Sequence, residues 1–302
     1  FYNSYKINTE EWHIGFIQEK HSMVNVFDTQ SVKLWIDGEK LDLFKGNVTE
    51  YKRRLDMRKG ITERSFVWEP PSGKKVQAEF TRMASFEMRP LFLICCRIRP
   101  LNFSGTVRIE SVQSGDVHNY FNKKDSRVAG EKRTHIQVRE SYSRGGTGVL
   151  VSETVNSGLR AVCAVRHILS GTAQTEISCE ENHIVYTADI PVSEGEWSTA
   201  EKYSILCDSR RYSDPEREAL KFMEDAAGKG SVYWYGKQEE FLERFWGNCA
   251  IEIDGDEELN LSLHFGQYGL LQSAGLDGVS NIGAKGLSGE GYEGHYFWDT
   301  EM

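Results

Sequence analysis

The hydrophobic pattern of the sequence changes once, near Asp208, and this change constrains the fold more than any other feature. From Ser31 to Cys207 the chain is a series of short runs rich in β-branched and aromatic residues, each bounded by Gly, Ser, Asn or Asp. Such runs without helical patterns between them are typical of antiparallel sheets. The sequence therefore predicts a mainly β protein with some α structure, built on a large antiparallel β-sandwich.

Two hairpins are marked by their turns. Asp37-Gly38, a pair that favours positive φ angles, separates the alternating run 31–36 from a second strand at 41–44. The cluster Pro70-Pro-Ser-Gly73 separates strands at 61–68 and 76–80. Further strands are expected at 91–98, 106–112, 134–138, 159–168, 183–190 and 201–206.

Helical signals follow Asp208. Ser213-Asp-Pro-Glu216 is a capping box, which predicts a helix start at Ser213, and the glycines of 228–230 mark its end. A second, short helix with an aromatic face is expected around 241–246.

The third predicted helix begins near Asp256 and stops at Gly275. It carries apolar residues around most of its circumference, so it needs partners on more than one side. The remaining chain is too short to supply them, and we expect the natural protein to continue beyond Met302.

The charge of the chain argues against one class of function. Its 302 residues carry a formal net charge of −9, whereas a nucleic-acid binder needs a basic surface to displace counterions from phosphates. No apolar run is long enough to suggest a membrane span, the longest being 91–96. We expect neither nucleic acid nor a membrane as a partner.

The cysteine and histidine patterns predict no metal site. Six cysteines are few for this length and none forms a CxxC pair, which argues against a disulfide scaffold or a zinc ribbon and favours a reducing cytoplasm. The histidines near the expected strands lack ligand-like spacing. They are His118, His135, His167 and His183. We expect no metal or organic cofactor.

The segment Gly289-Glu-Gly291-Tyr-Glu-Gly294 matches the dinucleotide-binding pattern GxGxxG, but the match is a decoy. It follows a helix and a loop instead of a buried strand, and Glu290 and Glu293 would repel a pyrophosphate.

The segment from Tyr292 to Glu301 gathers aromatic rings and carboxylates on a glycine-rich loop. Aromatic faces cover the apolar side of a pyranose, and carboxylates accept hydrogen bonds from its hydroxyl groups. The same composition suits an aromatic plug between helices, and composition alone favours neither interpretation. The tryptophans outside this loop are expected in the core or rim of the sandwich, with a carbohydrate-binding face as the alternative: Trp12, Trp35, Trp68 and Trp197.

Three stretches resemble one known family. The segment 270–301, with its run Gly291-Tyr-Glu-Gly-His-Tyr-Phe-Trp-Asp-Thr-Glu301, closely resembles the start of the catalytic domain of family 65 glycoside hydrolases, the maltose, kojibiose, nigerose and trehalose phosphorylases. Segments 55–64 and 100–105 are similar to the N-terminal β-domain of that family. The resemblance implies a large β-sandwich (a supersandwich), a helical linker and an (α/α)6 barrel.

By this resemblance we divide the chain into three parts. An N-terminal β-sandwich domain is expected at 1–208, a helical linker at 209–253 and the truncated start of the catalytic barrel at 254–302. The resemblance also implies a homodimer formed through the β-domain.

The resemblance further implies phosphorolysis of an α-linked glucose disaccharide with inversion. One carboxylic acid protonates the leaving oxygen while inorganic phosphate, the co-substrate, attacks the opposite face to give β-glucose 1-phosphate. Trp298 and Asp299 match the family's pair that holds the non-reducing glucose, and His295 is implied as a third substrate-binding residue.

No catalytic residue is expected in this chain, because the general acid and the phosphate loop lie further downstream in the family. The remaining carboxylates, Glu290, Glu293 and Glu301, are therefore not assigned the acid role. We expect these 302 residues alone to be catalytically inactive. Two alternatives stay open, a trehalase-type hydrolase of the same family and a non-catalytic carbohydrate-binding or dimerisation module.

Overall fold

The structure is a computed structural model, and it describes residues 2–6, 19–125, 128–286 and 289–298. An eight-stranded sheet has the order β10-β11-β12-β15-β8-β7-β6-β5, a five-stranded sheet has the order β13-β14-β9-β3-β4, and β1 and β2 form a separate hairpin. The bounds are β1 (Tyr2–Lys6), β2 (Glu19–Met23), β3 (Val32–Ile36), β4 (Glu39–Lys40), β5 (Asn47–Asp56), β6 (Ile61–Glu69), β7 (Val76–Ala84), β8 (Leu91–Pro100), β9 (Gly105–Ser114), β10 (Ile136–Arg144), β11 (Thr147–Thr154), β12 (Arg160–Leu169), β13 (Gln174–Cys179), β14 (His183–Val192), β15 (Ser198–Asp208), α1 (Pro215–Lys229), α2 (Ser231–Cys249), α3 (Glu257–Ser273) and the 3-10 turn η1 (Gly291–Gly294).

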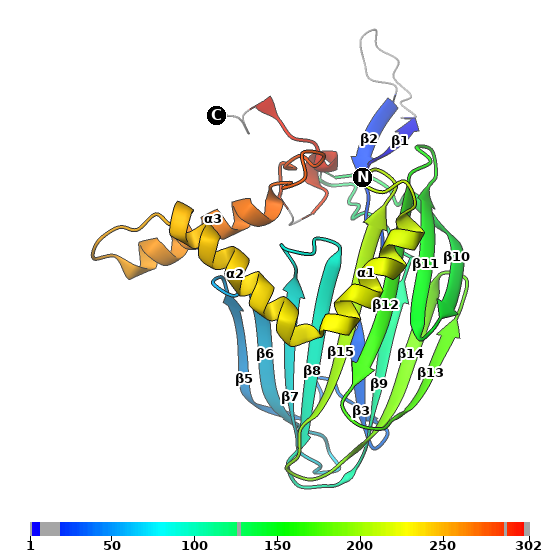
Figure 1. The fold of residues 1–302 in the computed structure, drawn as a ribbon, viewed down its shortest axis with the longest axis vertical. Coiled ribbons are helices and arrows are strands. Elements are labelled where there is room, and N and C mark those ends of the chain that lie inside the picture. The colour runs from blue at the N-terminus through cyan, green and yellow to red at the C-terminus, as the bar shows by residue number, and fades with distance from the viewer. Residues whose placement is uncertain (1, 7–18, 126–127, 287–288, 299–302) are drawn as a thin grey trace.

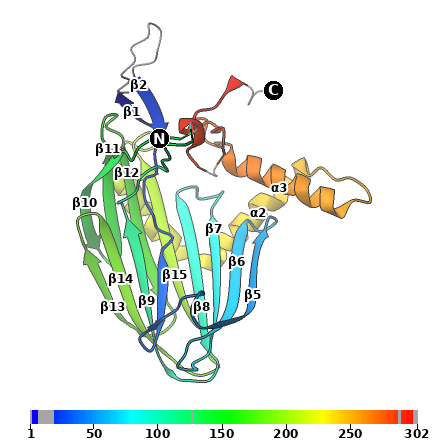
Figure 2. The ribbon, with the colours of Figure 1, turned by 180° about the vertical axis from the view of Figure 1, so that it is seen from behind.

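The two large sheets pack face to face, and their facing side chains form the main core (Figures 1 and 2). Alternate residues of a strand point into this core, as the two-residue period requires. In β7 these residues are Val76, Ala78 and Phe80. All paired strands in both sheets run antiparallel, so the predicted antiparallel β-sandwich is confirmed.

Helices α1 and α2 lie on the opposite face of the larger sheet (Figure 1). Met223 of α1 belongs to a second core that also contains Leu93 and Tyr203 of the sheet. Trp234 of α2 donates its indole N–H to the carbonyl of Ala226 at 3.0 Å, which joins the two helices. Strand β8 is therefore covered on both faces, which explains its nearly uninterrupted apolar sequence.

Helix α2 is seated on the turn between β5 and β6, one of the stretches that resemble the family. Gly60 has a φ of +64°, and a Cβ there would lie 2.5 Å from Gln238 Nε2 and 2.7 Å from Leu242 Cδ1. Gln238 is fully buried; its amide donates to the carbonyl of Ala84 at 3.1 Å and its Oε1 accepts from the Phe86 N–H at 2.9 Å. Glycine at position 60 thus lets the helix reach the sheet.

The predicted hairpins are present, with one correction. Strands β6 and β7 pair across the Pro-Pro-Ser-Gly turn, and Asp37 and Gly38 have the expected positive φ angles. The strand after Gly38 is only Glu39–Lys40, so the predicted strand at 41–44 is wrong. Asp42 accepts a hydrogen bond from the Phe44 N–H at 3.0 Å, and this local turn replaces the strand ladder. The other predicted strands are present as β8, β9, β10, β12, β14 and β15, and the structure adds β1, β2, β5, β11 and β13.

The helix boundaries need two corrections. The N-cap of α1 is Asp214, whose carboxylate accepts from the Arg217 N–H at 3.1 Å, so the predicted cap at Ser213 is wrong by one residue. The second helix is not short, because α2 begins directly after Gly230. Helix α3 begins where predicted, with Asp256 as its cap, and ends at Ser273.

Helix α3 buries only one side. Tyr268 and Leu271 are buried, whereas Leu261, Phe265 and Leu270 are largely exposed. The prediction that this helix is apolar on more than one side is confirmed, and the described residues leave those three side chains more exposed than buried. No helix in the described part of the chain is long and apolar enough to cross a bilayer, and all six cysteines are free.

Candidate functional site

The aromatic loop, residues 275–298, follows α3, and its described residues, 275–286 and 289–298, lie at the end of the sandwich where the β1–β2 hairpin also lies (Figures 1 and 2). Four of its aromatic side chains are exposed: Tyr292, Tyr296, Phe297 and Trp298, the last of them at 75%. Within the part of the chain that the structure describes, these rings do not plug a helix contact. Exposed ring faces are suited to cover the apolar side of a sugar.

The backbone of the aromatic loop is turned by consecutive left-handed residues. Tyr292 and Glu293 both have a φ of +59°, and Gly294 follows at +72°. Non-glycine residues in this region cost on the order of 1–3 kcal/mol each and persist where the surroundings fix them. A Cβ on Gly294 would lie 2.5 Å from the Cβ of Met23 in β2, so the turn is shaped by the hairpin beneath it.

Residues of the β1–β2 hairpin hold this turn. The hydroxyl of Tyr2 lies 2.7 Å from the carbonyl oxygen of Gly294 and 3.1 Å from Asn281 Oδ1. Its ring stacks on His295 with centroids 5.4 Å apart, and His295 Nε2 lies 2.6 Å from the carbonyl oxygen of His21. The predicted substrate-binding His295 is therefore engaged with the hairpin through its ring and one nitrogen.

Two glutamates near the end of the aromatic loop also hold it. Glu293 accepts a hydrogen bond from the Tyr5 hydroxyl at 2.8 Å, and Glu290 accepts from the side-chain amide of Asn25. Burial and the hydrogen bond to Glu293 raise the pKa of Tyr5, which therefore stays a neutral donor. Glu293 and Glu290 therefore both have anchoring partners in or near the hairpin.

The hairpin is in turn fixed to the sandwich. Asn3 Oδ1 accepts from the Asn156 N–H at 2.9 Å, and its amide nitrogen lies 3.3 Å from His135 Nδ1. Burial lowers the pKa of His135, so this imidazole is neutral at pH 7 and its Nδ1 can accept from Asn3. On the other strand, the side-chain amide of Asn119 donates to the Met23 carbonyl at 2.6 Å. The aromatic loop thus rests on the hairpin, and the hairpin rests on the sandwich.

The structure describes two of the three predicted substrate-binding residues. Trp298 is exposed at the end of the described loop, His295 lies against the hairpin, and Asp299 lies outside the described residues, as does Glu301. The anchors Tyr2 and Tyr5 were not found from the sequence, because they lie nearly 300 residues from their partners. The only signal for them is the aromatic composition of the first residues.

Three of the four tryptophans singled out from the sequence lie in the described part of the chain, and each already has partners. Lys40 Nζ lies over the ring of Trp35, 5.9 Å from its centroid. Trp68 is buried in the sandwich core and donates to the Lys45 carbonyl at 2.7 Å. The ring of Trp197 lies beneath the guanidinium groups of Arg97 and Arg99, at 4.3 and 4.9 Å from its centroid, so cations already occupy it. Trp12 lies outside the described residues. The described residues hold no group of three or more His, Cys, Asp or Glu that could bind a metal.

Comparison with known proteins gives a consistent set of relatives. The chain is 34% identical over 307 residues to the alpha,alpha-trehalose phosphorylase of Thermoanaerobacter brockii and 36% identical over 309 residues to that of Geobacillus stearothermophilus, with 100% of this chain and 40% of each relative covered. It is 29% identical over 293 residues to the kojibiose phosphorylase of Thermoanaerobacter brockii, covering 93% of this chain and 37% of the relative. The chain thus spans about two fifths of the length of these relatives.

The fold has a close counterpart among solved structures. A putative kojibiose phosphorylase from human microbiome superimposes with a TM-score of 0.87 at 19% identity, over 99% of this chain and 39% of that chain. Residues 1–245 match the model of the family 65 N-terminal domain, and residues 264–302 match that of the family 65 central catalytic domain. The chain therefore belongs to glycosyl hydrolase family 65.

Proposed function

We propose that the longer protein represented by this chain is an inverting disaccharide phosphorylase with α,α-trehalose as its first substrate. It cleaves the α-glucosidic bond with inorganic phosphate and releases β-glucose 1-phosphate and glucose. The observation that carries the proposal is that the exposed aromatic loop falls within the segment matched by the catalytic-domain model. The greater identity to two trehalose phosphorylases, 34 and 36%, than to kojibiose phosphorylases, 27 and 29%, supports trehalose.

In this proposal Trp298 and Asp299 hold the non-reducing glucose. The exposed indole covers the apolar face of the sugar, and the carboxylate accepts hydrogen bonds from its hydroxyl groups. His295 acts through the loop instead of on the sugar, because its ring and its Nε2 already contact Tyr2 and His21.

The chemical step needs one carboxylic acid, supplied from beyond residue 302. The acid transfers its proton to the glycosidic oxygen as that oxygen leaves with the second glucose. A phosphate oxygen attacks C1 from the opposite face, so the configuration at C1 inverts. Phosphate replaces the base-activated water of an inverting hydrolase, and no second catalytic carboxylate is required.

The domain division, the location and the assembly are also proposals. The last strand, β15, ends at Asp208, which supports a domain boundary at 208 and a helical linker over 209–253, before the barrel segment 254–302. Six free cysteines support a reducing cytoplasm. We propose a homodimer without metal or organic cofactor, which light scattering and metal analysis of the whole protein would test.

The first experiment offers trehalose, kojibiose, maltose and nigerose to the whole protein, with and without phosphate. We expect β-glucose 1-phosphate from trehalose only when phosphate is present. Turnover that persists without phosphate would instead identify a trehalase-type hydrolase. Saturable sugar binding without any turnover would identify a carbohydrate-binding module.

Replacing Trp298 tests the glucose site. We expect Trp298→Ala in the whole protein to lower kcat/KM for trehalose by roughly 10²-fold, a typical loss for a group acting on the transition state. The control Trp298→Phe keeps a ring and should lose less. Steady-state kinetics at varied trehalose and varied phosphate separate the two substrates, and kinetics unchanged by the alanine variant would refute the assignment.

A further inference from the structure

We propose that Arg211 is a positioning residue, which fixes the start of the aromatic loop to the end of the β-sandwich. The inference rests on the proposed function, because its kinetic consequence requires that this loop carry the glucose site. It deepens that function by naming a residue outside the loop on which substrate binding depends.

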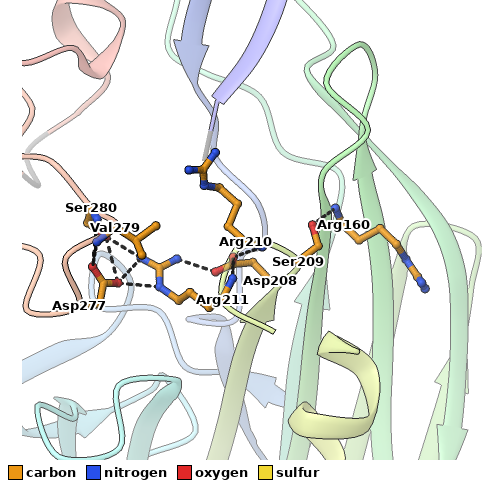
Figure 3. Close-up of polar contacts among 8 residues, drawn as sticks. All are labelled: Arg160, Asp208, Ser209, Arg210, Arg211, Asp277, Val279 and Ser280. Carbon is orange, nitrogen blue, oxygen red and sulfur yellow. Dashed lines mark hydrogen bonds and ion pairs between the residues drawn. The ribbon is translucent and has the colours of Figure 1, made fainter. Parts of the chain in front are cut away.

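Arg211 joins two segments that lie far apart in the sequence (Figure 3). Its Nη1 lies 2.6 Å from Asp208 Oδ2, at the end of β15. Its Nε lies 2.7 Å from Asp277 Oδ2, and its Nη2 lies 2.5 Å from Ser280 Oγ, both in the aromatic loop. Three nitrogens of one guanidinium thus connect the sandwich to the loop.

The carboxylates of Asp208 and Asp277 also accept hydrogen bonds from nearby backbone N–H groups, so each is fixed to its own turn. Asp208 Oδ1 accepts from the backbone N–H of Arg210 at 2.9 Å and of Arg211 at 3.1 Å. Asp277 Oδ1 accepts from the N–H groups of Val279 and Ser280, both at 2.9 Å. Burial opposes ionisation of Asp277, yet its hydrogen bonds, including those from Arg211, hold its pKa well below the usual range.

The side chains of Arg211, Asp208 and Asp277 are partly buried. The side chain of Arg211 is 35% exposed, and those of Asp208 and Asp277 are 17% and 15% exposed. Charges at this depth are screened less than those of a fully exposed pair, whose contribution is small. The three residues border a cleft of about 630 Å³ between the sandwich, the end of α3 and the loop, so a small solute can reach the guanidinium position.

The connection lies where the loop begins. Directly after Ser280, Asn281 accepts from the hydroxyl of Tyr2, so the hairpin provides the next anchor. The glycines that follow, at 283, 286, 289, 291 and 294, give the loop many conformations to lose on ordering. Removing the first anchor should therefore enlarge the set of positions available to Trp298.

The neighbouring Arg210 provides a matched control. Its side chain points away from the network, and its guanidinium makes no polar contact with any residue drawn (Figure 3). Arg210 also borders the same cleft. A lysine at position 211 would keep the charge but offers one nitrogen in place of the planar fork that reaches all three partners.

The kinetic experiment compares Arg211→Met, Arg211→Lys and Arg210→Met in the whole protein. We expect Arg211→Met to lower kcat/KM for trehalose about tenfold or more, while its KM for phosphate stays within about twofold of wild type. Arg211→Lys should show an intermediate loss, and Arg210→Met should match wild type. A fourth variant, Arg211→Ala, tests chemical rescue. Methylguanidinium at millimolar concentration should restore part of its activity, because the cleft beside position 211 can admit this small cation. Equal kinetics for the two methionine variants, or a loss confined to phosphate, would overturn the inference.

A second measurement does not depend on activity. Amide hydrogen exchange should be about tenfold faster at Val279, Ser280 and 289–295 in Arg211→Met than in wild type, and unchanged in Arg210→Met. Unchanged exchange in Arg211→Met would overturn the positioning role even in an active enzyme. A wild-type protein without phosphorolysis would refute the proposed function, while the exchange data would still decide whether Arg211 holds the loop.

Discussion

Lys202 lies between the two large sheets of the sandwich, and its replacement by methionine tests how a buried charge affects stability. Its side chain is on β15, the residue is 2% exposed, and its Nζ donates to the carbonyls of Val112 at 3.0 Å and Ser31 at 3.3 Å. It forms no ion pair with the described residues. Burial lowers the pKa of Lys202 to about 8. Burial and the charge of Lys202 lower the pKa of the nearby His167, so its imidazole adds no second positive charge at pH 7.

The magnitude follows from the pKa. A shift from 10.5 to about 8 at 1.36 kcal/mol per unit means that the charged lysine costs about 3 kcal/mol at pH 7 relative to the unfolded chain. Between these two values the unfolded chain binds the proton and the folded chain does not, so stability rises with pH. Raising the pH from 7 to 9.5 should therefore add about 2 kcal/mol to the free energy of unfolding of wild type through this group.

Urea unfolding of the whole protein at pH 7 and pH 9.5 measures this difference. Lys202→Met should lack the increment of about 2 kcal/mol expected for this group, whereas Lys132→Met, a change at an exposed lysine, should keep it. At pH 7 the methionine variant loses two hydrogen bonds to carbonyl oxygens but also the cost of the buried charge. We expect it to be at least as stable as wild type there.

One pattern would refute this reasoning. If Lys202→Met is destabilised at pH 7 by about 2 kcal/mol or more and shows the same change from pH 7 to pH 9.5 as wild type, the buried ammonium is not the source of the cost.

Three further substitutions test the fold by thermal unfolding. Gly60→Ala should lower the free energy of unfolding by about 2 kcal/mol or more, because its Cβ would collide with Gln238 and Leu242, and a wild-type melting temperature would contradict that close approach. Gln238→Leu should cost about 2 kcal/mol by leaving the Phe86 N–H and the Ala84 carbonyl without partners, and a neutral effect would mean that water replaces the amide. Asp214→Ala should cost about 1 kcal/mol while Asp214→Ser is nearly neutral, and equal melting temperatures for the two would place the helix cap elsewhere.

The local pattern of the sequence determined the class of fold and most of its elements. The two-residue period of strands, the positive-φ pair at 37–38 and the proline cluster at 70–73 act within a few residues, so they can be recognised without the rest of the chain. The capping of α3 by Asp256 is equally local. Where two local signals compete, the pattern predicted the wrong one. It predicted Ser213 instead of Asp214 as the helix cap, and a strand instead of a turn at 41–44.

Only the tertiary structure decided how the aromatic loop is held. Tyr2 contacts Gly294, and Arg211 contacts Asp277, across many tens of residues or more. The close approach of Gly60 to Gln238 of α2, which seats that helix on the sheet, also joins residues far apart in the sequence. The full length of α2 likewise depends on tertiary packing, because its first turns belong to the core on the larger sheet and its later turns pack against α3. Contacts between distant segments leave no periodic trace in the sequence, because they arise from the packing of surfaces that exist only after the sheets have formed.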